Sequence, residues 1–279
     1  MDQSPENDRR LNVSKLASLL KTHTIANPAD TKVELWDSID STNVRAAALG
    51  EQGAPGGMLV VAREQTAGRG RLGRQWTSPP DSGIYASFLL RPHSALIPNL
   101  SAITLGAGVA AAEAIEAAAG VSVGLKWVND LILNGKKAGG ILAQMSYRDG
   151  KQALVIGIGI NISLQPDDVP EDLRQKVTWL EEVTDQPVDA NVVLAQLCYS
   201  LERIYDLMLA NEVATILDQW RRRSVTLGKY VRAVSGDKEW EGTAEDIAQS
   251  GALLLRTSSG LQELHAGEIS IRGIDGSYS

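Results

Sequence analysis

Apolar residues in the first half of the chain follow either helical or strand spacing. Leucines at helical spacing predict a short helix over residues 11–21, and alanine-rich stretches predict helices over 44–49 and 100–119. The mixture of helices and strands predicts an α+β fold with several antiparallel neighbours. Strands are expected at 33–36, 58–62, 84–90, 136–145 and 154–162, with a strand, turn and strand at 123–135 and a hairpin turn at 148–151.

In the second half of the chain the composition and the spacing of apolar residues change twice. Residues 163–188 form an Asp/Glu/Pro-rich connection, and residues 190–209 and 213–223 then have the spacing of two helices. Beyond residue 228, short alternating runs predict a small β-barrel with strands at 230–234, 239–247, 252–256, 261–265 and 268–271. We therefore predict a tail and short helix over 1–30 (with 1–10 disordered), a main domain over 31–223 and a barrel domain over 224–279.

Four glycines interrupt the strands predicted at 136–145 and 154–162. Gly139, Gly140, Gly157 and Gly159 weaken a strand unless a ligand or another backbone must come close to it. We therefore expect this face of the sheet to be a binding surface.

Residues 63–76, directly after the strand predicted at 58–62, interleave glycines with arginines. The glycines allow sharp turns and close approach to a ligand, and Arg69, Arg71 and Arg74 offer planar donors for phosphate or carboxylate. Residues 63–74 carry a net charge of +3, although the whole chain carries −7. A local positive region in an acidic chain favours a small anionic ligand over a long polyanion.

Two other interpretations fit this Gly/Arg stretch. Such a run can be a solvated loop that binds nothing. The spacing Gly68-x-Gly70-x-x-Gly73 also spells a dinucleotide-binding fingerprint, which needs a helix at the glycines and an acidic residue about 20 positions later. The proline pair at 79–80 excludes that helix, and the next strand runs into Arg91-Pro92 rather than a carboxylate.

Composition narrows the class of protein. The 279 residues are 43% hydrophobic and 22% charged, as in ordinary globular proteins. A pI of about 5.1 argues against nonspecific nucleic-acid binding. The start of the chain lacks the apolar segment of a secretory signal, and no stretch approaches a run of about 18 uncharged apolar residues, which predicts a cytoplasmic protein without a membrane partner. One cysteine excludes an internal disulfide, and three scattered histidines offer no zinc spacing.

Six short motifs follow one another in an order typical of one family. They are Ser41-Thr42-Asn43, Glu64-Gln65-Thr66, Gly68-Arg-Gly-Arg-Leu-Gly-Arg74, Lys126-Trp-Val-Asn129-Asp130, Lys137-Ala-Gly-Gly-Ile-Leu142 and Gly157-Ile-Gly159-Ile-Asn161. From about residue 33 to 271 the chain resembles the biotin protein ligases. The resemblance implies a mixed-sheet catalytic domain of the biotin/lipoyl ligase type followed by a small SH3-like β-barrel.

The resemblance also implies a two-step reaction. With Mg²⁺ present, the carboxylate of biotin attacks the α-phosphate of ATP to give biotinyl-5'-AMP and pyrophosphate. The ε-amine of one lysine in a biotin carboxyl carrier protein domain, from acetyl-CoA carboxylase or a related biotin-dependent carboxylase, then attacks the mixed anhydride and forms an amide. Neither step needs a protein nucleophile, which agrees with the lack of any Ser-His-Asp or Cys-His arrangement.

The family's roles carry over to the matching motif positions of this chain. The implied catalytic residues are Lys137, Arg71 and Asp130, with Asp130 as the general base for the incoming lysine. The implied biotin-binding residues are Ser41, Thr42, Asn43, Gln65, Arg69, Arg71 and Lys137, and the nucleotide-binding residues are Arg69, Arg74, Trp76, Asn129, Lys137 and Asn161. No metal ligand is assigned. Ser41 and Thr42 could instead simply cap a helix, and Asp130 could be a turn residue that pairs with Lys126.

Partners and rival functions follow from the same motifs. The 36 residues before Asp37 are too few for the winged helix of the family's repressor branch, so we predict no DNA binding; a homodimer is a candidate assembly. Val128 departs from the family, which usually has proline at this point of the turn. A lipoyl-protein ligase shares the fold and the adenylate chemistry but has a different glycine-rich signature. A nucleic-acid or regulatory binding module could also use the arginine loop without catalysis.

Overall fold

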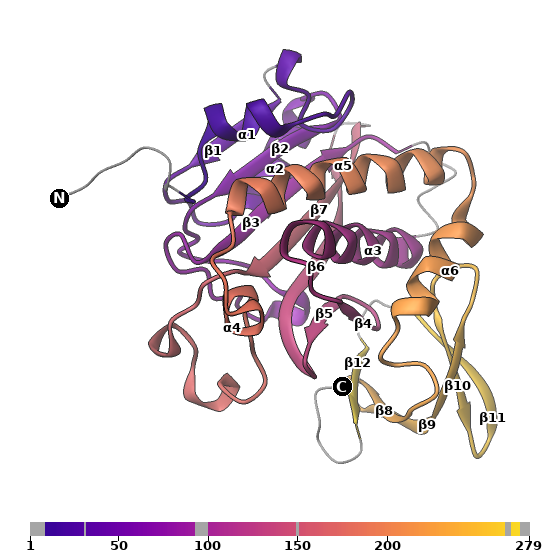
Figure 1. Ribbon diagram of the computed structural model, residues 1–279. Coiled ribbons are helices and arrows are strands. Elements are labelled where there is room, and N and C mark those ends of the chain that lie inside the picture. The colour runs from indigo at the N-terminus through magenta and orange to yellow at the C-terminus, as the bar shows by residue number, and fades with distance from the viewer. Residues whose placement is uncertain (1–8, 31, 93–99, 149–150, 266–268, 274–279) are drawn as a thin grey trace.

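A seven-stranded and a five-stranded sheet form the framework of the chain (Figure 1). The computed structural model describes residues 9–30, 32–92, 100–148, 151–265 and 269–273. The large sheet has the order β1-β2-β3-β7-β6-β5-β4 and is mixed, because β1 pairs with β2 in parallel and the other neighbours are antiparallel. Its strands are β1 (Val33–Trp36), β2 (Met58–Ala62), β3 (Gly83–Leu90), β4 (Gly124–Lys126), β5 (Asp130–Leu133), β6 (Lys136–Arg148) and β7 (Lys151–Asn161).

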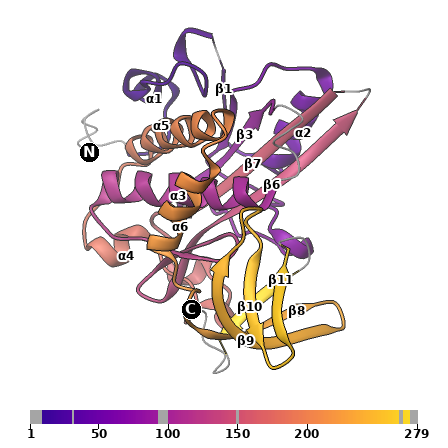
Figure 2. The same cartoon turned by 90° about the vertical axis from the view of Figure 1, so that its right-hand side faces the viewer.

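Helices cover both faces of the large sheet (Figure 2). The long helices α3 (Leu100–Ala119) and α5 (Ala190–Leu209) pack together on one face, with α6 (Val213–Arg223) against α3. On the other face α2 (Thr42–Gln52) buries Ala46 and Leu49 against β2, β3 and β7. Within the described residues, α3 is the single helix long and apolar enough to cross a membrane. Its apolar stretch is 72% buried inside the fold, as expected of a core helix. The short helices are α1 (Val13–Leu19) and α4 (Leu180–Thr184), with 3₁₀ turns at Pro28–Asp30, Arg71–Gly73, Pro166–Asp168 and Glu171–Leu173.

Alternation along β7 decides which face carries the strand glycines. Ile156, Ile158 and Ile160 point into the large core beneath α3 and α5. Gly157 and Gly159 therefore lie on the opposite face, the one that α2 covers only in part. The predicted binding face of the sheet is thus the α2 face.

The C-terminal sheet is small, entirely antiparallel and joined to the large one. Its order is β11-β10-β9-β8-β12. The backbone N–H of Trp127 donates to Thr226 Oγ1 (2.9 Å) and its indole N–H to the Gly251 carbonyl (3.0 Å), so the turn after β4 is anchored to this sheet. Its strands are β8 (Tyr230–Ser235), β9 (Lys238–Ile247), β10 (Leu253–Thr257), β11 (Gly260–Leu264) and β12 (Ser270–Gly273). The predicted α+β class, with a mixed sheet followed by a small β domain, is confirmed; residue 268 of the last predicted strand and residues 149–150 of the predicted hairpin turn lie outside the described residues.

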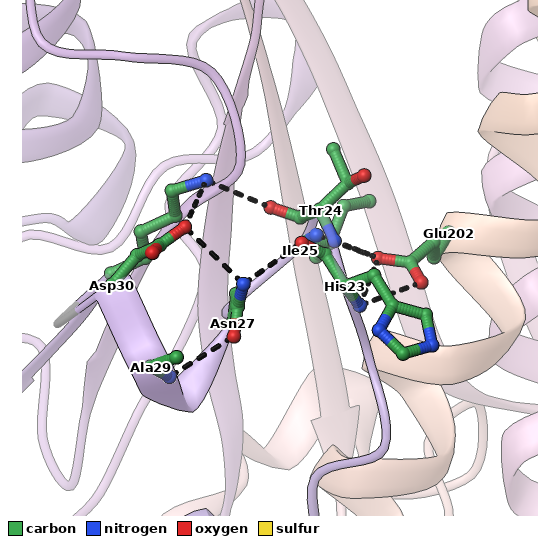
Figure 3. Close-up of polar contacts among 8 residues, drawn as sticks. His23, Thr24, Ile25, Asn27, Ala29, Asp30 and Glu202 are labelled. Atoms are coloured by element: carbon green, nitrogen blue, oxygen red, sulfur yellow. Dashed lines mark hydrogen bonds and ion pairs between the residues drawn. The ribbon is translucent and has the colours of Figure 1, made fainter.

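The N-terminal segment packs into the main core through a buried carboxylate on α5 (Figure 3). Glu202 accepts hydrogen bonds from the backbone N–H groups of His23 (3.0 Å), Thr24 (2.6 Å) and Ile25 (2.7 Å). Arg63, at the start of the Gly/Arg stretch, donates to the carbonyl of Leu11. The boundary predicted at residue 30 stays a prediction, but residues 11–30 share the core of the main sheet; residues 1–8 of the predicted tail lie outside the described residues.

We predict that Glu202→Ala destabilises the fold by about 2–4 kcal/mol, because three backbone N–H groups lose their buried acceptor and that of Ile25 is itself buried. The free energy of unfolding from urea titration measures this. Asp206→Ala is the matched control, because Asp206 lies one turn further along α5 at an exposed position. Equal stabilities of the two variants would contradict the role given to Glu202.

Candidate functional site

The polar residues singled out from the sequence meet in one cavity of about 340 Å³ on the α2 face of the large sheet. They come from the start of α2, the segment after β2, the β4–β5 turn, β6 and β7. All twelve line it: Ser41, Thr42, Asn43, Gln65, Arg69, Arg71, Arg74, Trp76, Asn129, Asp130, Lys137 and Asn161.

At one end of the cavity a hydrogen-bond network fixes the start of α2. Gln65 Oε1 accepts from the backbone N–H (2.9 Å) and the hydroxyl (3.1 Å) of Thr42. Ser87 on β3, which the sequence analysis missed, donates to Asn43 Oδ1 (2.5 Å) and lies 2.8 Å from Thr42 Oγ1. The Ser41 hydroxyl is buried and has no protein partner among the described residues, so it can bond a ligand. Ser41 does sit at the N-cap position, but its side chain makes no capping bond.

Two of the strand glycines make room for side chains that shape the cavity. A Cβ at Gly157 would lie 2.0 Å from Asn43 Oδ1, and one at Gly159 would lie 2.6 Å from the Trp76 ring. The close approach predicted for these strands is therefore made by Asn43 and Trp76. Gly139 differs, because a Cβ there would meet the Gly159 carbonyl and Leu131, within the sheet itself.

At the other end of the cavity lie the cations. Lys137 Nζ pairs with Asp130 Oδ1 at 2.5 Å and lies 5.3 Å from the centre of the Trp76 ring. Arg71 donates to Asn129 Oδ1 (3.1 Å) and to the carbonyl of Ile269 (3.2 Å), which joins the Gly/Arg stretch to both the β4–β5 turn and the C-terminal sheet. Burial lowers the pKa of the Arg71 guanidinium, and the negative charge of Asp130 opposes this shift.

Backbone carbonyls hold the two asparagines that were predicted on the nucleotide side. Asn129 Nδ2 donates to the Ile141 carbonyl (3.0 Å), and Asn161 Nδ2 donates to the Thr178 carbonyl (3.0 Å). The second bond ties the segment after β7 to the strand. A 3₁₀ turn at Arg71–Gly73 reverses the chain within the Gly/Arg stretch, which lines the cavity. Leu72 (φ 58°) and Gly73 (φ 70°) adopt the left-handed backbone region there.

The sequence analysis missed one wall of the cavity. The stretch expected to be a mere connection pairs with β6, because the Lys137 N–H donates to the Lys176 carbonyl (2.8 Å) and the Thr178 N–H donates back to the Lys137 carbonyl (2.9 Å). Spaced apolar residues within the acidic stretch were the available signal. The missed lining residues include Leu164, Asp168, Val169, Leu173, Val177 and, from the C-terminal part, Ile269 and Ile271.

Comparison with known proteins places this cavity in a family. The model of the biotin/lipoate A/B protein ligase family matches residues 35–161, and that of the biotin protein ligase C-terminal domain matches residues 226–272. A biotin–[acetyl-CoA-carboxylase] ligase of Paracoccus denitrificans is 35% identical over 239 residues, which are 84% of this chain and 98% of that protein. The chain belongs to the biotin protein ligase family.

Further relatives agree with this assignment. The bifunctional ligase/repressor BirA of Bacillus spizizenii is 36% identical over 236 residues, covering 84% of this chain and 72% of the relative. Among solved structures, the biotin protein ligase of Aquifex aeolicus in complex with biotin and ATP has a TM-score of 0.76 at 30% identity, covering 87% of this chain and 99% of that one. The predicted family is confirmed, and the roles of single residues stay predictions.

Proposed function

We propose that this biotin protein ligase activates biotin with ATP and transfers it to a lysine of a biotin carboxyl carrier protein domain, of acetyl-CoA carboxylase or a related carboxylase. The observation that supports this most is the two-ended cavity. A neutral hydrogen-bonding pocket at the start of α2 lies in the same space as Lys137 and Arg71. Such a cavity suits a ligand with a polar ring at one end and a carboxylate at the other.

The pocket at the start of α2 would hold the ureido ring of biotin. Ser41, Thr42, Asn43 and Gln65 supply donors and acceptors without a formal charge, as a neutral ring requires. The valeryl chain would then run along the glycine face of β7 towards the cations. There Arg69, Arg71 and Lys137 would bind its carboxylate.

The first step brings two anions together. A carboxylate oxygen of biotin attacks the α-phosphorus of ATP, and pyrophosphate leaves with the electron pair of the broken P–O bond. Arg69, Arg71, Arg74 and Lys137 reduce the repulsion and stabilise the charge that builds up on the phosphate. Trp76, Asn129 and Asn161 line the part of the cavity that we assign to the nucleotide.

Mg²⁺ would enter with the nucleotide. Among the described residues, no group of three or more His, Cys, Asp or Glu side chains could hold a metal ion. In ATP-using sites Mg²⁺ is bound largely by phosphates, with one or two carboxylates. Asp168 is a carboxylate that lines the cavity, so the residues present fit an ion that ATP carries and whose charge offsets that of the phosphates.

In the second step the carrier lysine attacks the carbonyl carbon of the adenylate, and AMP leaves. An ammonium has no lone pair for this attack, so a base must first take a proton. Asp130, at the edge of the cation cluster, is our candidate for that base.

Assembly and location are part of the same proposal. We propose a cytoplasmic enzyme that does not bind DNA and for which a homodimer is a candidate assembly. The BirA relatives are named ligase/repressors, and the matched region covers 72% of the Bacillus spizizenii relative. A gel-shift assay with that relative's operator tests DNA binding. A sedimentation measurement with and without biotin and ATP tests the homodimer.

Biotin-dependent exchange of labelled pyrophosphate into ATP tests the first step. We expect exchange with biotin and none with lipoate in its place. Exchange supported by lipoate alone would contradict the proposed substrate.

We predict that Gly157→Ala weakens biotin binding by roughly tenfold or more, because a Cβ there would displace the Asn43 amide from the ureido pocket. Isothermal titration with biotin measures the change. Gly108→Ala is the matched control: it adds the same methyl group in α3, where the nearest atom lies 3.6 Å away, and it should bind biotin like the unmodified chain. Normal binding by Gly157→Ala would contradict the placement of the ureido ring.

A further inference from the structure

Asp130 lies among cations from three separate elements. Lys137 on β6 pairs with it at 2.5 Å, and the side chains of Lys137 and Asp130 are only 19% and 14% exposed. Lys126 on β4 stands opposite Asp130 in the β4–β5 register and is buried. Arg71 of the Gly/Arg stretch interacts electrostatically with Asp130 and donates hydrogen bonds to Asn129 and to the carbonyl of Ile269.

The Lys137–Asp130 pair works against both roles given to its members. Lys137 is to attract the biotin carboxylate and the α-phosphate, but a carboxylate at 2.5 Å offsets its charge. Asp130 is to accept a proton from the carrier lysine, but a carboxylate bonded to an ammonium is a weaker base. Each role needs the pair to be broken.

We propose that the Lys137–Asp130 pair is a counter-ion switch that sets the order of the two steps. When the biotin carboxylate and the α-phosphate occupy the cavity, Lys137 Nζ turns from Asp130 to these anions. Loss of this counter-ion makes Asp130 a stronger base for the second step, while Lys126 and Arg71 remain nearby. This inference rests on the proposed function and adds to it that adenylate formation itself prepares the base.

The second step is balanced in these terms. The carrier's ammonium gives one proton to the Asp130 carboxylate, and its lone pair forms the bond to the acyl carbon. The bond from that carbon to the phosphate oxygen breaks, and its electron pair leaves on AMP. After the attack the nitrogen loses a second proton to solvent, and its third proton stays as the amide N–H. Lys137 stays with the phosphate and stabilises the leaving group.

The switch makes a prediction whose sign is unusual for a residue in an active site. Asp130→Asn keeps the shape of the side chain but removes the charge that competes for Lys137. We expect Asp130→Asn to bind biotin roughly tenfold more tightly in the absence of ATP, because one negative charge near the carboxylate site is gone. A merely structural role for Asp130 would weaken biotin binding.

The transfer step gives a second and independent readout. Biotinyl-adenylate is formed on the enzyme and then offered either the carrier domain or hydroxylamine, an amine that is already neutral at pH 7. We expect Asp130→Asn to slow transfer to the carrier lysine by roughly a hundredfold, the range of a lost general base, and to leave the reaction with hydroxylamine unchanged. Glu113→Gln, which neutralises the carboxylate of a remote ion pair with Arg203, is the matched control and should change neither readout.

The outcomes separate the switch from the proposed function. No biotin-dependent pyrophosphate exchange by the unmodified chain would overturn the proposed function itself. Exchange by that chain, with unchanged or weaker biotin binding by Asp130→Asn, would overturn only the switch, as would equal slowing towards lysine and hydroxylamine. If Asp130→Asn does not fold, a structure of the unmodified chain with a non-hydrolysable biotinyl-adenylate analogue decides. Lys137 should then contact the analogue beyond hydrogen-bond reach of Asp130, and an intact pair would overturn the switch.

Discussion

Replacing Lys137 with alanine is expected to slow biotinyl-adenylate formation by roughly 10²–10³-fold, the range for loss of one preorganised group that stabilises developing charge. Three contacts hold this ammonium in the cavity. Its backbone pairs with residues 176–178, Asp130 lies at 2.5 Å and the Trp76 ring lies beneath it. Among the described side chains of β6, Lys137 is the one cation that lines the cavity.

Lys136→Ala is the control for this experiment. Lys136 precedes Lys137 on β6, and its side chain alternates to the other face of the strand, outside the cavity lining. Pyrophosphate exchange measures both variants, and the unfolding transition checks that each is folded. Loss of activity in Lys136→Ala equal to that in Lys137→Ala would show that general charge, not a positioned ammonium, supports the step.

Replacing Arg71 with alanine should also slow adenylate formation, by roughly 10²-fold, and should loosen the segment that covers the cavity. Its guanidinium binds Asn129 and the carbonyl of Ile269, so one side chain joins three parts of the chain. We therefore expect faster trypsin cleavage within residues 69–74 of the variant as well as lower activity. Lysine at this position should restore little, because a single ammonium cannot make both bonds in the same plane.

Arg45→Ala controls for the loss of an arginine elsewhere on the same face. Arg45 pairs with Glu34 at 2.9 Å and lies over Trp36, away from the cavity. Its loss should leave exchange and the cleavage pattern unchanged. An Arg71→Ala variant with normal exchange, or with cleavage no faster than that of Arg45→Ala, would show that Arg71 neither binds the adenylate nor holds the segment.

The helices and strands could be predicted because the spacing of apolar residues that marks them lies within each segment. The amphipathic stretches 190–209 and 213–223 coincide with α5 and α6, where regularly spaced apolar side chains are buried against α3. The strand glycines at 157 and 159 correctly marked a face of close approach. The motif residues were also brought to one cavity: some begin α2 or follow β2, and others lie on β6 and β7 themselves.

Contacts between distant residues were not predictable in the same way. The Glu202 carboxylate accepts hydrogen bonds from backbone N–H groups about 180 positions earlier in the chain. Nothing in the local pattern of either segment indicates this pairing. The wall formed by residues 164–177 is built from two 3₁₀ turns and a bridge to β6, which the periods of helices and strands do not describe. The contact of Arg71 with Ile269 likewise depends on how the two sheets are joined.

Transfer of biotin to a carrier domain is the most direct measurement of the central claim, that one cavity performs both activation and transfer. The chain is mixed with ATP, Mg²⁺, a biotin carboxyl carrier domain and either biotin or lipoate, and the carrier is examined by mass spectrometry after peptide digestion. The account predicts one amide-linked biotin on a single lysine, dependent on ATP, with no lipoyl product. A lipoyl product in place of the biotinyl product, or an adenylate that forms but never reaches the carrier lysine, would contradict it.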